Sequence, residues 1–223
     1  MTTSIGYKFQ IDAIGFSEKR MKLLVELFYG MYNLRLPFEK ENNIDFYARR
    51  IYNRGLGFEP TNLESYAALR GDFGFAPRTR EVPVGAYRGK NPIIKVPSGK
   101  VVISIGFNPT DFRHDFENRN QVMVAILDAM IKVYYFLSPD FGKGGNSYAF
   151  ESVDGNLRDY LFPINFFGPK EVERIGRRRI LAAPAYKVEE LKDGGILLLI
   201  SPNPFEFQVD PKKVAEFLGL KYG

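Results

Sequence analysis

Hydrophobic and polar residues alternate near the start of the chain, and a helical pattern follows. Between Tyr7 and Ala13 every second residue is apolar, which is the period-2 pattern of a half-buried strand. Ser17 is a suitable cap for a helix that runs to about Asn33, with apolar residues along one side. The same helical spacing recurs over Asn43–Asn53. The opening segment is therefore predicted to be a strand followed by two helices.

The longest apolar stretch is Asn118–Leu137. From Val122 onwards its only charged residues are Asp128 and Lys132, which are four apart, so that one narrow stripe of a helix carries both. A helix that is apolar nearly all round must be covered on most sides, and we expect it to form the centre of the core. It is not a membrane span, because a span needs about 20 uninterrupted apolar residues.

Glycine and proline punctuate the region between these helices. Residues 61–70 fit a capping box and a short third helix. Residues 71–99 contain too many breaks for long elements, and we expect an irregular connection with a short strand such as Ile93–Val96. A weak domain boundary within 71–99 is the competing interpretation. Lys100–Phe107 is a clear strand leading towards the central helix.

The last third of the chain has the sharpest signals. Tyr186–Leu191 and Ile196–Ser201 are strands joined across Lys192–Gly195, which is typical of a hairpin. The second strand is apolar without a break, which predicts burial on both faces. Asp210 followed by a proline opens a final helix, and Gly219 closes it.

These elements together predict an α+β fold in one domain, 1–223. A strand at Pro163–Phe167 and a short helix from Pro169 to Gly176 complete the set. Because hairpins and helices are interspersed, we expect a largely antiparallel mixed sheet packed against helices on one face, with the long central helix at about 118–137.

Composition removes several kinds of chemistry. The chain has no cysteine and one histidine, which excludes thiol nucleophiles, disulfides, thiolate zinc sites and multi-histidine metal sites. The start of the chain lacks a signal peptide, so we expect a soluble, cytoplasmic protein without a cofactor. A net charge of +5 permits nucleic-acid binding without diagnosing it. Scarce glutamine and absent cysteine suggest a heat-adapted source.

An acidic cluster precedes the central helix. Asp111, Asp115 and Glu117, with His114 between them, have the side chains that hold Mg²⁺ or exchange protons. The simpler interpretation is an acidic lead-in that interacts favourably with the positive end of the helix dipole. Nearby arginines neutralise much of this charge, which favours the simpler interpretation.

A second set of carboxylates imitates a nuclease. Asp140 followed far downstream by Glu190 and Lys192 has the order in which metal-dependent nucleases use two carboxylates for Mg²⁺ and a lysine for the water or phosphate. The motif is short and common by chance. Charged residues are also expected where a strand enters a hairpin turn, so no catalytic residue is assigned.

Gly142, Gly144 and Gly145 with Lys143 resemble a phosphate-binding loop in composition only. A phosphate loop ends in glycine, lysine and serine or threonine before a helix, and this order is absent. We therefore interpret residues 140–146 as a flexible turn.

The densest basic stretch is the candidate binding site, and it comprises Lys170, Arg174, Arg177, Arg178 and Arg179. Such a run binds phosphate backbones, and neighbouring Phe166 and Phe167 would stack on bases if exposed. The alternative is a solvated edge strand whose arginines face water. Nucleic-acid binding requires Arg177–Arg179 to share a surface with Lys19, Arg20 and Lys22.

The order of elements in the last third resembles immunity proteins of bacterial polymorphic-toxin and type VI secretion systems. The resemblance rests on Phe162–Gly168, on Ala183–Pro204, on the short closing helix and on Ser138–Gly142 ahead of them. It covers about half the chain. The early tryptophans of that family are absent, and the positive charge differs from the acidic blockers of nuclease toxins. The resemblance implies a protein that binds one protein partner and has no catalytic activity.

The sequence thus predicts a macromolecule-binding protein. A protein is the expected partner, and membrane binding is not expected. Nucleic-acid binding through residues 170–179 is the first alternative and a Mg²⁺-dependent nuclease the second. The tyrosine-rich helices fit a partner-facing groove and a buried core equally well. Oligomeric state is left open.

Overall fold

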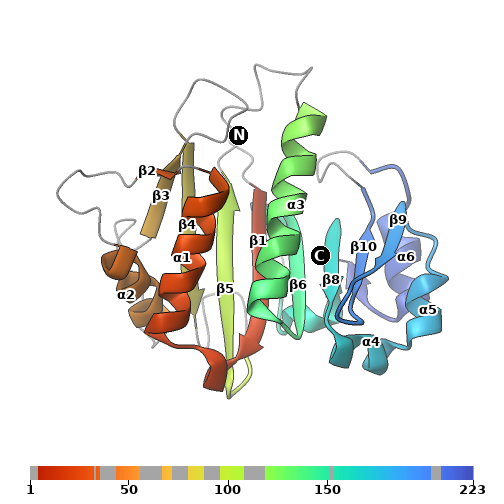
Figure 1. Cartoon of the computed structure of the whole chain (residues 1–223). Helices are drawn as coiled ribbons and strands as arrows, with labels where there is room; N and C mark the ends of the chain where they lie inside the picture. The colour runs from red at the N-terminus through yellow and green to blue at the C-terminus, as the bar shows by residue number, and fades with distance from the viewer. Residues whose placement is uncertain are drawn as a thin grey trace.

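A nine-stranded antiparallel sheet runs across the part of the chain that the computed structural model describes (Figure 1). The described residues are 5–32, 34–35, 44–55, 67–71, 80–87, 96–107, 119–150, 153–201 and 207–222. The strand order is β2-β3-β4-β5-β1-β6-β8-β10-β9. The strands are β1 (Ile5–Asp12), β2 (Leu34–Arg35), β3 (Ala67–Gly71), β4 (Arg80–Tyr87), β5 (Lys100–Phe107), β6 (Phe141–Asn146), β8 (Ile164–Phe167), β9 (Lys187–Glu190) and β10 (Ile196–Leu199).

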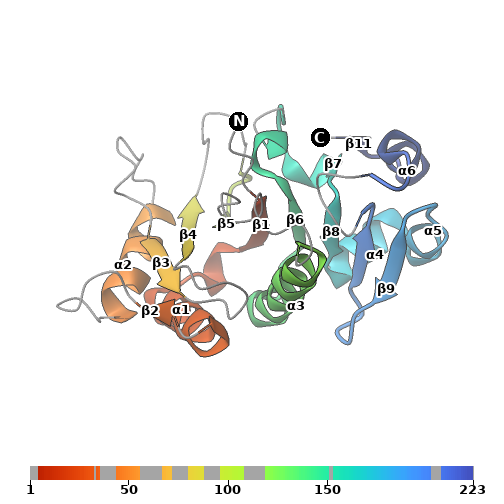
Figure 2. The ribbon, with the colours of Figure 1, turned by 90° about the horizontal axis from the view of Figure 1, so that it is seen from above.

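Helices cover both faces of this sheet, so the α+β class is confirmed while the expectation of one covered face is wrong. The front helices are α1 (Glu18–Tyr32), α2 (Ile44–Gly55) and α3 (Arg119–Leu137). The helices α4 (Pro169–Ile175), α5 (Arg177–Leu181) and α6 (Pro211–Leu218) gather at the C-terminal end. Leu197 and Leu199 of β10 pack with the front cluster, whereas Ile196 and Leu198 pack with the residues of α4–α6. Figure 2 shows α6 behind the sheet, opposite α1 and α3.

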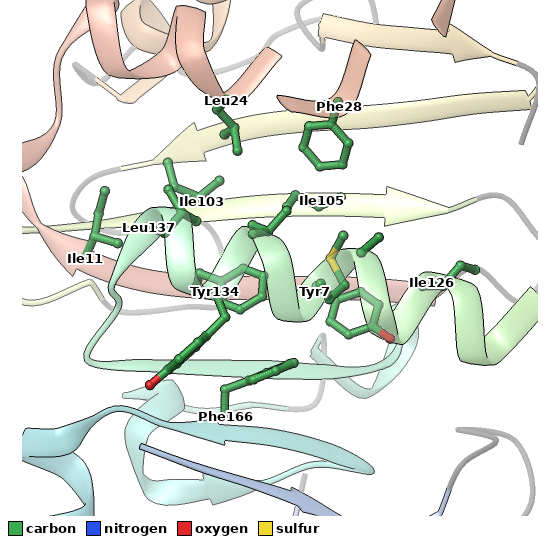
Figure 3. Close-up of a cluster of buried hydrophobic side chains, with 14 of the residues drawn as sticks. Tyr7, Ile11, Leu24, Phe28, Ile103, Ile105, Ile126, Tyr134, Leu137 and Phe166 are labelled. Atoms are coloured by element: carbon green, nitrogen blue, oxygen red, sulfur yellow. The ribbon is translucent and has the colours of Figure 1, made fainter. Parts of the chain in front are cut away.

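The front face confirms the alternation seen in the sequence. Tyr7 and Phe9 of β1 are fully buried beneath the helices and lie opposite Ile105 and Ile103 of β5. Figure 3 shows Tyr7, Ile103 and Ile105 converging with Leu24 and Phe28 of α1 and with Tyr134 of α3. Burial of such large side chains contributes about 1.5–3 kcal/mol each to the free energy of folding. This cluster is therefore the main source of stability.

The long helix α3 lies on the sheet, and one narrow stripe of its surface is exposed. Met130, Val133 and Tyr134 are buried, whereas Val124 is 56% exposed and Tyr135 is 36% exposed. Asp128 and Lys132 also face solvent. The expectation of cover on most sides is confirmed, because the exposed residues between Met123 and Leu137 form one narrow stripe that carries Asp128 and Lys132.

Arg20 of α1 fastens the end of α3. Its guanidinium donates hydrogen bonds to the carbonyl oxygens of Phe136 at 3.1 Å, Leu137 at 2.7 Å and Gly15 at 3.1 Å. The last four carbonyls of a helix have no partner within the helix, so Arg20 supplies two of the missing donors. The two front helices are thereby linked where α3 ends.

Residues 140–146 form a central strand rather than a flexible turn. β6 pairs with β1 on one side and β8 on the other. A Cβ at Gly142 would stand 2.5 Å from ring carbons of Phe9, and one at Gly144 would stand 2.5 Å from a ring carbon of Tyr7. The glycines are therefore explained by aromatic rings that cross the strand, and not by flexibility.

Two further element types differ from expectation. Ala67–Arg70, expected to be helical, belongs to β3, because β2 and β4 pair with it on either side. The predicted start of that helix at 61–66 lies outside the described residues. Arg177–Leu181, expected as an edge strand, is α5: Gly176 at φ 99° ends α4, and Ile180 turns into the core behind the sheet.

The C-terminal elements confirm the sequence interpretation. β9 and β10 form the expected hairpin, and β10 is buried between β8 and β9. The Asp210 carboxylate accepts a hydrogen bond from the Lys212 backbone N–H at 3.0 Å and so caps α6. Gly219 ends α6 at φ 71°, the left-handed conformation that favours glycine.

The segment 153–162 covers part of the back face. It includes the turn of 3₁₀-helix Leu157–Asp159 and the short strand β7 (Tyr160–Leu161), which pairs in parallel with β11 (Lys221–Tyr222). Within residues 71–99, β4 pairs with β3 on one side and β5 on the other, so one sheet runs through this stretch. A single domain therefore remains our prediction. Within the described ranges no helix is long and apolar enough to cross a bilayer.

Candidate functional site

The nuclease-like residues are not brought together. Asp140 immediately precedes Phe141, which pairs with Phe167, then Ile196, then Glu190 across neighbouring strands. Three strand spacings amount to roughly 14 Å. A shared cation would require both carboxylates within a few ångström of one point.

Asp140 instead belongs to an ion-pair network at one end of β1, β5 and β6. Lys100 Nζ lies 2.6 Å from Asp140 Oδ2 and 2.7 Å from Asp12 Oδ1, and Gln10 Nε2 donates to Asp140 at 3.3 Å. The hydrogen bond from Lys100 lowers the pKa of the Asp12 carboxyl below its ordinary value. Burial opposes the charge of Lys100, yet its bonds to the two carboxylates raise the pKa of its amine. This network holds strand ends together.

Glu190 and Lys192 are also occupied by structural contacts. Arg177 forms an ion pair with Glu190 and donates to the carbonyl oxygen of Gly194 at 2.7 Å. On the other side, the Lys192 backbone N–H donates to the Tyr135 hydroxyl at 3.0 Å. The hairpin turn is thereby held between α5 and α3.

The acidic cluster Asp111, Asp115 and Glu117, with His114, lies outside the described residues. Among those described, no group of three or more histidine or carboxylate side chains is arranged to hold a metal ion.

The basic stretch is divided among different contacts. Lys170 lies 3.7 Å from Asp12 Oδ2, and Arg174 and Arg177 form ion pairs with Glu171 and Glu190. Arg178 and Arg179 remain on the outer side of α5. The basic stretch is therefore not one continuous surface.

The predicted nucleic-acid surface is not formed either. Arg20 is bound to the carbonyls that end α3, and Lys22 forms an ion pair with Asp45 at 2.7 Å. α1 and α5 lie towards opposite ends of the sheet (Figures 1 and 2). Phe166 and Phe167 are fully buried and so unavailable for stacking on bases.

A mixed basic and aromatic surface does form where α5 meets α6. Arg179, Lys213, Glu216 and Phe217 line an open pocket of about 500 Å³. Arg179 donates through Nε to the Phe217 carbonyl oxygen at 2.7 Å, which fixes the guanidinium against the last turn of α6. The Phe217 ring is 40% exposed. We call these four residues the α5–α6 surface.

Exposed residues on the same two helices add positive charge and apolar area to this surface. Arg178 and Leu181 of α5 are exposed, and Lys212 is exposed in the first turn of α6. Among the described residues, Arg178, Lys212 and Lys213 have no carboxylate within ion-pair distance. Arg178, Arg179, Lys212 and Lys213 thus lie exposed on the same two helices as one carboxylate, Glu216, and the exposed Leu181 and Phe217.

Sequence reasoning identified Arg178 and Arg179 but missed the α6 residues. Phe217 has the helical spacing of a core residue beside buried Val214 and Leu218, so the sequence pattern assigns it to the core. The available signal was Lys212 and Lys213 at the start of the same helix, which give α6 a basic side.

Comparisons with known proteins identify a fold but no family. No protein-family model matches the chain, and no curated protein matches it. Among solved structures, the chain is similar to a type VI secretion system (T6SS) protein of Pseudomonas aeruginosa, PA0821, with a TM-score of 0.52 and 9% sequence identity. That similarity covers 99% of this chain and 73% of the other. The chain therefore has the fold of a T6SS protein along its whole length.

Proposed function

We propose that this protein works by binding a protein partner through the α5–α6 surface, in the manner of an immunity protein. The observation that carries this proposal is the exposed Phe217 ring between Arg179 and Lys213. Aromatic residues and arginine are enriched at protein interfaces, because they combine a large contact area with hydrogen-bonding groups.

Two further observations support a binding role. The carboxylates that resemble a nuclease are engaged with Lys100 and Arg177, which hold strand ends and the hairpin. The T6SS-like fold fits the resemblance between the last third of the sequence and immunity proteins.

The cations of the α5–α6 surface also fit phosphate groups, so nucleic-acid binding is the second candidate. The two candidates differ in their salt dependence. A surface that neutralises several phosphates loses affinity steeply as the salt concentration rises. A surface centred on an aromatic side chain that becomes buried on binding does not. A titration of the protein against a fluorescent 20-mer DNA and RNA at 50 and 200 mM salt separates them.

Site-specific cross-linking tests the protein-binding role. A photoreactive phenylalanine analogue at Phe217 should yield one dominant cross-linked protein in the native host. The same analogue at Ile14, which is fully exposed in the 3₁₀ turn Ala13–Gly15 ahead of α1, provides the matched control. A cross-link to the same protein from both positions contradicts the assignment of the α5–α6 surface.

Charge reversal then measures the contribution of the cations. With the cross-linked protein purified, Arg178→Glu together with Lys213→Glu should weaken binding at least tenfold, about 1.4 kcal/mol. Lys132→Glu, on the outer side of α3, should leave the dissociation constant unchanged. Equal losses in both variants contradict the proposal.

A further inference from the structure

A lysine lies fully buried in the middle of the back face of the sheet. Lys143, on β6, has no exposed surface. Its Nζ donates to Asn165 Oδ1 at 3.3 Å and lies 4.8 Å from the centre of the Phe167 ring. Long charged side chains are almost never fully buried unless they are paired. Lys143 therefore requires an explanation that packing alone does not supply.

The strand register places a second lysine next to it. Lys8 of β1 is the direct cross-strand partner of Lys143, and Asn165 of β8 is its partner on the other side. Lys8 is only partly buried and reaches Ser104 at 3.4 Å. Like charges directly opposite each other across a strand pair are destabilising, so Lys8 disfavours a charge on Lys143.

The surrounding carboxylates do not offset the cost of burying a charge on Lys143. Glu171 on α4 is 1% exposed but forms ion pairs with Arg158 and Arg174. Asp159, in the 3₁₀ turn Leu157–Asp159, attracts the charge of Lys143 as Glu171 does, whereas Arg174 repels it. None of the described carboxylates lies within 4.0 Å of Lys143 Nζ. Burial, as the largest cause, lowers the pKa of the Lys143 amine to about 7.

The segment 153–162 forms a cover next to this lysine, because the Asn165 side chain that binds Lys143 also accepts from the Phe162 N–H and donates to the Phe162 carbonyl oxygen. The segment 153–162 contributes Val153, Leu157 and Phe162, which pack with Phe141 and Phe150 on the back of the sheet. Its regular structure consists of one turn of 3₁₀-helix and the two-residue strand β7. Short elements with few backbone hydrogen bonds open more readily than the strands beneath them.

We propose that Lys143 makes the cover formed by residues 153–162 sensitive to pH, so that the cover is closed over the neutral amine and opens when the amine is protonated. An ammonium under this cover has one hydrogen bond for its three donors. In the open state water supplies the other two, and the charge is no longer disfavoured.

The direction of the pH dependence follows from the difference in proton binding between the open and closed states. The amine binds protons with an ordinary lysine pKa in the open state and a lower one in the closed state. Between about pH 10 and pH 7 the open state therefore binds more protons, and opening becomes about tenfold more favourable for each unit that the pH falls. Below about pH 7 both states are protonated, and the dependence ends.

A single cysteine reports the opening directly, because the chain has none of its own. Val153→Cys places a thiol at a buried position of the cover itself, and its rate of reaction with a disulfide reagent is measured at pH 7.5, 8.5 and 9.5. The matched variant carries Val153→Cys together with Lys143→Met, so the titration of the thiol itself cancels in the ratio of rates. The ratio of the first rate to the second should rise about tenfold for each unit from pH 9.5 to 7.5. A constant ratio overturns the proposal.

A measurement on the unaltered protein keeps the proposal testable if the cysteine variants do not fold. The NMR chemical shift of the Lys143 Cε carbon follows protonation of the amine. A midpoint two or more units below that of Lys212, which is exposed on α6, supports the proposal. A midpoint equal to that of Lys212 overturns it.

Discussion

The two faces of the central sheet place different chemistry beneath their covers. The front face buries apolar and aromatic side chains under two long helices, with Phe9 and Ile103 at its centre. The back face, at the same strands, buries Lys143 and Asn165 under short segments. The two faces of one sheet therefore contribute differently to the free energy of folding. The front face supplies stability, and the back face contains a group whose charge opposes folding.

Phe9→Ala should produce the largest loss, because it removes a fully buried ring from the front face. The expected cost is about 3–5 kcal/mol in the free energy of unfolding, measured by urea denaturation. Lys132→Ala, on the solvent side of α3, should change it by less than about 0.5 kcal/mol. A cost below about 1 kcal/mol for Phe9→Ala would refute the dominance of the front face.

Arg20→Met should cost about 2 kcal/mol, because it leaves the carbonyls at the end of α3 without the charged donor that satisfies them. Methionine keeps much of the apolar stem, so the loss reports the hydrogen bonds. Lys19→Met, exposed on the same helix, is the control. Amide hydrogen exchange in the last turn of α3 should accelerate in the first variant and stay unchanged in the second.

Lys143→Met should have the opposite sign and stabilise the protein at pH 7.5 by about 1–2 kcal/mol. Burial lowers the pKa of this amine in the folded state to about 7, so wild-type stability is lowest below that pH and rises towards pH 10. The advantage of the variant should therefore shrink as the pH rises. Denaturation midpoints at pH 7.5 and 9.5 test this. A stability difference between Lys143→Met and the wild type that grows with pH would contradict the conclusion that the charge of Lys143 opposes folding.

Tyr134→Phe should have the smallest effect, about 1 kcal/mol, by removing the bond that its hydroxyl donates to Asp193 at 2.8 Å. Burial and the Asp193 carboxylate raise the pKa of this phenol. Absorbance at alkaline pH should show Tyr134 ionising only on unfolding. Tyr186→Phe, at a half-exposed position, should leave stability unchanged.

The structure of the front face could be predicted from the sequence, and that of the back face could not. The alternation in β1 and the apolar spacing of α1 reflect burial on one side, which local pattern records directly. β6 looks like a loop, because its glycines are required by the rings of Tyr7 and Phe9, more than 130 residues away. Local sequence has no record of such a contact.

The candidate site was predictable only in part for the same reason. Arg178 and Arg179 are conspicuous in the sequence, but whether they lie on a strand or a helix depends on Gly176 and on the burial of Ile180. Phe217 has the spacing of a core residue. Its exposure depends on where α5 and β10 stop covering α6, which is a property of the assembled fold.

The position of β1 has a consequence for biosynthesis. Its two partners, β5 and β6, are about 90 and 130 residues further along the chain. At a ribosomal speed of about 5–20 residues per second, the emerging Tyr7–Ile11 segment waits on the order of ten seconds before its second neighbour is synthesised. Both edges of this apolar strand are unpaired until β5 emerges, and one edge stays unpaired until β6 follows, so the nascent polypeptide is a natural client for a ribosome-associated chaperone.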